Sequence, residues 1–153
     1  MTAIAQKASE STPAAVPSTW LETLGSLFRK QLRSEADILN LVQNGVTDTV
    51  YIKVAQHLQL PKDAIGAETT IRNRLKSHSR LNADETERLL MIGRVYAMAR
   101  ALFGSDEKAI AWLHKPARYL RDTAPIAPIE LATRDAGVRL LEEKILRTAH
   151  GMS

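Results

Sequence analysis

Cysteine is absent from the 153 residues, so the chain has no disulfide, no thiolate metal ligand and no cysteine nucleophile. Long apolar runs are absent too: none approaches the roughly 20 residues that a helix needs to cross a bilayer. No apolar stretch follows the early Lys7 in the way of a secretory signal. These absences favour a protein of the reducing cytoplasm that makes no use of a membrane.

Common catalytic and metal-binding patterns are also missing. The histidines, His57, His78, His114 and His150, are too far apart in the sequence to form a His-x-x-x-His or Glu-x-x-His pair. There is no glycine-rich phosphate loop and no nucleophile elbow. The adjacent acidic pairs stand at expected helix starts or on exposed faces. We therefore expect a non-enzyme that needs neither a metal nor a cofactor.

The positive charge of the chain is concentrated in one segment. The net charge is +4. Residues 60–80 contribute +3 of it, because they hold five basic side chains and two acidic ones: Lys62, Arg72, Arg74, Lys76 and Arg80 against Asp63 and Glu68. Such an excess suits a nucleic-acid backbone. A solvated helix face is the equally simple interpretation.

Apolar residues recur every three or four positions along most of the chain, and no strand-like alternation appears. The pattern predicts an all-α fold of six to eight helices with short connections. Residues 1–17, rich in Ala, Ser, Thr and Pro, are expected to form a disordered tail. A short helix is expected over residues 62–65. The longest helix should start after Asn82, which forms a capping box with Glu85, and end at Gly104.

Residues 69–76 have the composition of a helix that reads DNA. Ile71 and Leu75 lie four apart and are expected to face inward. Thr hydroxyls and helix N–H groups bind phosphates, Arg and Asn recognise guanine and adenine, and Lys holds the backbone by charge. The outward-facing candidates are Thr69, Thr70, Arg72, Asn73 and Lys76.

Residues 81–151 form a series of short motifs in a fixed order. The series is Leu81…Asp84-Glu85-Thr86-Glu87-Arg88, Leu102-Phe103-Gly104-Ser105, Ala109…Ala111-Trp112-Leu113…Pro116, Leu120…Thr123-Ala124-Pro125, Thr133…Ala136-Gly137 and Arg147…Gly151. In this order the motifs resemble the Xre/MbcA/ParS antitoxins of bacterial type II toxin–antitoxin systems. Two departures lie in the loop: Arg121 and Asp122 stand where that family usually has a glycine pair, and Pro128 follows Pro125.

The resemblance implies a function and partners. Such an antitoxin binds a cognate RES-type toxin, which resembles ADP-ribosyltransferases and degrades NAD, and neutralises it by occluding the active site. The resemblance also adds Arg74 to the DNA-binding candidates and implies a homodimer that represses its own operon through operator DNA. The implied fold is an N-terminal helix-turn-helix-like part joined through a long helix to a C-terminal helical toxin-binding part.

The toxin-binding candidates fall into two groups. Around an expected loop they are Trp112, Arg118, Tyr119 and Arg121, and at the end of the last helix they are Arg147, Thr148, His150, Gly151 and Met152. Simpler interpretations stand beside them. Trp112 is flanked by Ile110 and Leu113 and would be a core residue, and cations at a helix C-terminus complement the helix dipole.

We expect three regions: a tail over residues 1–17, an Xre-like helix-turn-helix and dimerisation domain over residues 18–95, and a toxin-binding domain over residues 96–153. The last boundary falls inside the long helix. Two alternatives stay open. One is a helix-turn-helix transcriptional regulator without a toxin partner, and the other is a helical adaptor that binds neither DNA nor toxin.

Overall fold

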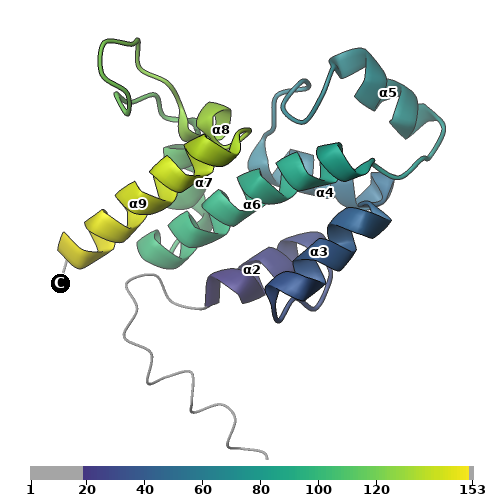
Figure 1. The fold of residues 1–153 in the computed structure, drawn as a ribbon, viewed down its shortest axis with the longest axis horizontal. Helices are drawn as coiled ribbons and strands as arrows, with labels where there is room; N and C mark the ends of the chain where they lie inside the picture. Colours follow the sequence, from purple (N-terminus) through teal and green to yellow (C-terminus); the bar gives the residue numbers. More distant parts are fainter. Residues whose placement is uncertain (1–18, 152–153) are drawn as a thin grey trace, which may run out of the picture.

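The computed structural model describes residues 19–151, so the tail expected over residues 1–17 lies outside the described residues. Every regular element in the described part is a helix, which confirms the all-α fold (Figure 1). The helices are α2 (Thr19–Phe28), α3 (Glu35–Asn44), α4 (Asp48–Leu58), α5 (Glu68–Lys76), α6 (Ala83–Phe103), α7 (Asp106–His114), α8 (Pro128–Leu131) and α9 (Asp135–Gly151). None of the helices in this part is long and apolar enough to span a membrane.

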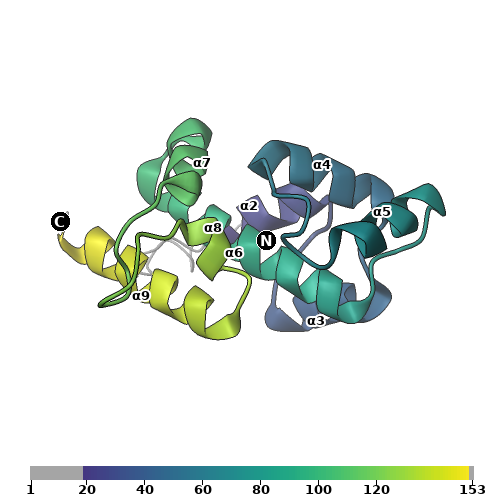
Figure 2. The same cartoon turned by 90° about the horizontal axis from the view of Figure 1, so that it is seen from above.

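The long helix α6 is the centre of the fold. It contacts α2 and α3 from the N-terminal half and α7 and α9 from the C-terminal half (Figures 1 and 2). Leu89, Ile92, Val95 and Ala99 along it are fully buried. A helix that is apolar on most of its sides is one surrounded by other helices. Burial of α6 therefore joins the two halves into one hydrophobic core.

Both ends of α6 form as the sequence predicts. The Asn82 side chain accepts a hydrogen bond from the Glu85 N–H at 2.8 Å, and the Glu85 carboxylate accepts one from the Asn82 N–H at 2.9 Å. This reciprocal pair satisfies two of the free N–H groups of the first turn. At the other end Gly104 adopts φ 71°, in the left-handed region that glycine enters without strain.

A glycine in α6 allows α2 to pack closely. A Cβ atom at Gly93 would lie 2.9 Å from Phe28 Cε1 and 3.0 Å from Leu24 Cδ1. Both of these α2 side chains are almost completely buried. The missing side chain thus makes room for Leu24 and Phe28 against α6.

The connection between α4 and α5 differs from the prediction. The expected helix over residues 62–65 is a turn, in which the Ala64 N–H donates to the Pro61 carbonyl at 3.2 Å. Tertiary contact rather than local propensity decides the path of this segment. Ile65 anchors the turn because its side chain is fully buried. The short helix α8 begins with Pro128 in its first turn, a position that accepts proline. No apolar periodicity in the sequence indicates this helix.

Candidate functional site

Helix α5 displays the predicted DNA-reading residues at one edge of the molecule (Figures 1 and 2). Ile71 is buried and Leu75 is half-buried, so these two side chains attach the helix to the core as expected. The opposite side of the helix is free in the described structure. Its exposed side chains are Thr69, Thr70, Arg72, Asn73 and Lys76.

The Arg72 guanidinium is held loosely. Its Nη2 lies 3.2 Å from Glu68 Oε2, one helical turn away, and both side chains are about half exposed. An exposed ion pair of this spacing contributes only about 0.3–0.5 kcal/mol. A phosphate or a base edge can therefore replace Glu68 as the partner of Arg72 at little cost.

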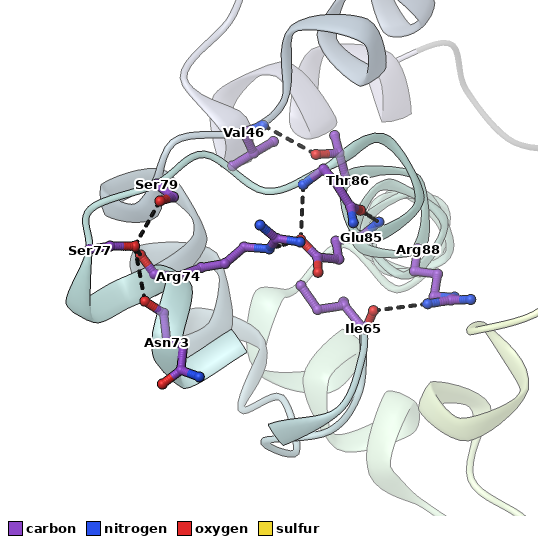
Figure 3. A network of polar contacts seen from close by, with 10 residues as sticks. Val46, Ile65, Asn73, Arg74, Ser77, Ser79, Glu85, Thr86 and Arg88 are labelled. Carbon is purple, nitrogen blue, oxygen red and sulfur yellow. Dashed lines mark hydrogen bonds and ion pairs between the residues drawn. The ribbon is translucent and has the colours of Figure 1, made fainter. Parts of the chain in front are cut away.

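Arg74 is turned away from this surface (Figure 3). Its Nε lies 2.6 Å from Glu85 Oε1, and the Glu85 side chain is only 6% exposed. Glu85 also caps the Asn82 N–H, so one carboxylate serves both the start of α6 and the inner side of α5. The structure thus separates Arg74 from the other five predicted residues and gives it a structural partner.

Further polar contacts hold the α3–α4 and α4–α5 connections against α6 (Figure 3). The Val46 N–H donates to Thr86 Oγ1 at 3.2 Å, and Arg88 Nη1 donates to the Ile65 carbonyl at 3.1 Å. Thr86 is fully buried. Sequence reasoning missed this network because it joins residues far apart in the chain, and a buried hydroxyl leaves no mark in a periodicity.

The loop between α7 and α8 projects from the molecule on the side away from α5 (Figure 1). Ala117 and Ile126 exchange two backbone hydrogen bonds, at 3.1 and 2.9 Å, which close its base. Inside the loop the Thr123 hydroxyl donates to the Leu120 carbonyl at 3.1 Å. Leu120 is 44% exposed. The loop therefore presents an apolar side chain on a closed backbone.

The departure from the family pattern in this loop has a structural counterpart. Asp122 adopts φ 58°, in the left-handed region that favours glycine. Aspartate is one of the few other residues that enter this region at modest cost. The chain thus keeps a left-handed turn where the resembling antitoxins usually carry a glycine pair.

The four loop candidates divide into aromatic and basic side chains. The Trp112 ring is half-buried and lies 6.2 Å from that of Phe103, as the core interpretation predicts. Tyr119 is also half-buried, and burial raises its pKa. Arg118 and Arg121 are exposed. The loop therefore offers two exposed cations beside Leu120, of which Arg118 also donates through Nη1 to the Thr123 carbonyl at 3.4 Å. Its aromatic residues largely support the loop from within.

The end of α9 offers a second group of candidates. Arg147 Nη2 lies 3.1 Å from Glu143 Oε2 in an exposed ion pair, and the Thr148 hydroxyl donates to the Lys144 carbonyl at 2.9 Å. Leu146 beside them is exposed. The surroundings of His150 and Gly151, and all of Met152, lie outside the described residues.

A polar cluster connects α4 to the C-terminal half. His57 Nε2 lies 2.8 Å from Asp106 Oδ1, and the Tyr96 hydroxyl donates to the same oxygen. Nearby, His114 Nε2 donates to the Leu58 carbonyl at 2.8 Å. Burial, together with Asp106, raises the pKa of Tyr96 far above its usual value, so Tyr96 stays protonated. No group of three metal-binding side chains occurs among the described side chains, residues 20–148.

Comparison with known proteins identifies the class to which these features belong. Residues 98–151, which run from the second half of α6 to the end of α9, match the family described as the antitoxin Xre/MbcA/ParS C-terminal toxin-binding domain. This helical C-terminal part is therefore similar to a toxin-binding domain.

A relative that is similar over most of both chains agrees with this match. Antitoxin Xre of Pseudomonas putida is 28% identical to the chain over 124 residues, which cover 79% of this chain and 76% of the relative. The chain is thus similar to antitoxins of the Xre/MbcA/ParS family, and its matched region is similar to a domain that binds a toxin.

Proposed function

We propose that the chain neutralises a RES-type toxin, an NAD-degrading enzyme of the ADP-ribosyltransferase-like class, by occluding its active site. The observation that carries the proposal is the pair of exposed apolar residues in the toxin-binding domain. Leu120 stands between Arg118 and Arg121 on the projecting loop, and Leu146 stands beside Arg147 near the end of α9. Both groups have an apolar anchor and a basic rim, as recognition surfaces do.

Inhibition of this kind requires no chemistry from the antitoxin. A closed loop and the end of a long helix are narrow, convex elements of the size that enters a cleft. Arg147 is the side chain we assign to the substrate pocket of the toxin, because its exposed ion pair with Glu143 is easily exchanged. Thr148, His150, Gly151 and Met152 would follow it, and Trp112 and Tyr119 would support the loop.

The division of labour follows α6. Residues 18–95 would form the DNA-binding and dimerisation domain and residues 96–153 the toxin-binding domain, with the boundary inside one continuous helix. A homodimer would place two copies of α5 on the half-sites of the operator and repress the operon. Thr69, Thr70, Arg72, Asn73 and Lys76 would contact DNA, and Arg74 would position α5.

The test of neutralisation uses the protein encoded beside this chain. Expressed alone in a bacterial host it should arrest growth and lower cellular NAD, and co-expression of the full chain should restore both. If the neighbouring protein arrests growth without lowering cellular NAD, the antitoxin role stands but the toxin is not of the RES type. A harmless neighbour would favour a transcriptional regulator without a toxin partner. The DNA-binding part is tested separately, by a salt-dependent mobility shift of the chain's own promoter fragment.

A further inference from the structure

A groove on the described surface joins the toxin-binding domain to the N-terminal half. It has a volume of about 460 Å³. Helix α3 forms one wall, the start of α9 forms the other, and α6 runs between them (Figures 1 and 2). The apolar lining consists of Leu24, Ile38, Leu39, Val42, Leu90, Met91 and Val138. Leu39 is the most exposed large apolar residue of the described chain, at 57%.

The rim of this groove is acidic although the chain as a whole is basic. Four acidic and two basic side chains surround it, which gives a local charge of −2: Glu35, Glu87, Asp135 and Glu142 against Arg94 and Arg139. A locally negative hollow with apolar walls attracts a positively charged partner.

Both arginines of the rim already have acidic partners. Arg94 Nε lies 2.8 Å from Glu142 Oε2, and its guanidinium stacks 4.8 Å from the centre of the Trp20 ring. Arg139 Nη2 lies 2.8 Å from Asp135 Oδ2. Glu87 has no ion-pair partner among the described residues. The excess negative charge is therefore available to a ligand of opposite sign.

We propose that this groove docks a basic amphipathic helix of the toxin. The proposal rests on the proposed function and adds the chemistry of the partner: apolar residues at helical spacing, flanked by Lys or Arg. An apolar groove with a charged rim takes one face of such a helix. The wall formed by Asp135, Val138 and Glu142 belongs to the toxin-binding domain matched at residues 98–151, so the groove continues that surface.

A second copy of the chain fits the groove less well. In a symmetric dimer each patch meets itself, so two rims of charge −2 would face each other. Like charges in close contact oppose association. The outer wall of the groove comes from α3, which lies outside the matched domain. The toxin contact would then extend beyond residues 98–151 and use both halves of the antitoxin.

The test measures the affinity of the purified toxin for full-length variants. Leu39→Ser removes the apolar anchor and Glu87→Lys inverts the unpaired charge; each should raise Kd by about tenfold or more. The loss of affinity caused by Glu87→Lys should become smaller as the salt concentration rises, because salt screens the charge repulsion. Ile52→Ser on α4 and Glu22→Lys on α2 are matched controls on exposed residues outside the groove and should leave Kd unchanged. Unchanged melting temperatures exclude misfolding, and the milder Glu87→Gln should give a smaller loss of the same kind.

The outcomes separate this inference from the proposed function. If Leu39→Ser and Glu87→Lys bind the toxin as tightly as the wild type does, the groove is not a toxin-docking site and the antitoxin role still stands. If the wild-type chain binds no toxin, the proposed antitoxin function itself is wrong. Full toxin binding combined with a dimer that dissociates in Leu39→Ser would show that a second copy occupies the groove, and the proposal would fail.

Discussion

His57 on α4 and Asp106 on α7 lie 2.8 Å apart, between Nε2 and Oδ1, and join the N-terminal and C-terminal halves beside α6. The Tyr96 hydroxyl of α6 donates to the same carboxylate. Burial alone would raise the pKa of Asp106, but the hydrogen bonds from Tyr96 and His57 outweigh it and hold that pKa below its ordinary value. Three helices thus share one ionised carboxylate.

Replacement of Asp106 by Ala should weaken this junction. We expect the free energy of unfolding to fall by about 0.5–1 kcal/mol, a modest loss because the side chains are partly exposed. A carboxyl whose folded pKa is depressed stabilises the protein above its unfolded pKa and loses that effect as the pH falls through the folded pKa. The difference between Asp106→Ala and wild type should therefore be full at neutral pH and shrink in acid, as thermal unfolding followed by circular dichroism would show. Glu107→Ala, in the same helical turn without these contacts, is the control. An equal loss in both variants would contradict the role of the cluster.

Gly137 should be essential to the junction of α8 and α9. A Cβ atom there would lie 1.9 Å from the Leu131 carbonyl oxygen, which is a backbone clash that no side-chain rotation relieves. Gly137→Ala should lower the free energy of unfolding by about 2–3 kcal/mol. Gly104→Ala is the matched comparison, because its φ of 71° strains alanine but its surroundings are open. It should cost about 1–2 kcal/mol. Urea unfolding measures the free energy of unfolding of both variants. Equal losses of stability in the two variants would contradict the predicted backbone clash at residue 137.

Arg72 and Arg74 should behave differently although only one residue separates them. Arg72→Ala should weaken promoter binding and reduce the slope of log K against log salt by about one, with an unchanged melting temperature. Arg74→Ala leaves the Glu85 carboxylate without its cation and should lower stability by about 1–3 kcal/mol. Mobility-shift titrations at several salt concentrations, with thermal melts beside them, measure the two effects. If the Arg72→Ala variant is destabilised, or the Arg74→Ala variant is as stable as the wild type, the assignment of Arg72 to DNA contact and of Arg74 to structure is wrong.

Deletion of residues 147–153 should abolish toxin neutralisation and leave the rest of the protein folded. The core residues of α9, Val138, Leu141 and Ile145, precede the deletion and remain buried in the described structure. Growth after toxin induction and the helical signal of the purified protein are the measurements. A truncated chain that still protects cells would show that the end of α9 is not the inhibitory element.

The features that are local in sequence could be predicted. The caps of α6 depend on Asn82, Glu85 and Gly104 alone, and each acts on residues within one turn. The inward direction of Ile71 and the burial beneath α5 follow from helical spacing. The C-terminal domain was recognisable because its motifs keep their order along the chain.

The features that depend on tertiary contact could not be predicted. Arg74 carries the same charge as Arg72, and only the position of Glu85 on another helix turns it inward. The groove requires α3 and α9, which are distant in sequence, to lie on either side of α6. His57 and Asp106 likewise give no local signal that they meet.

Co-purification tests whether the chain binds the protein encoded beside it. The full chain, carrying an affinity tag, is co-expressed with the untagged protein encoded beside it, and the eluate is analysed by size exclusion with light scattering. We expect a stable complex of the two proteins with a defined mass. Elution of the tagged chain alone, from cells that demonstrably contain the soluble neighbour, would contradict it.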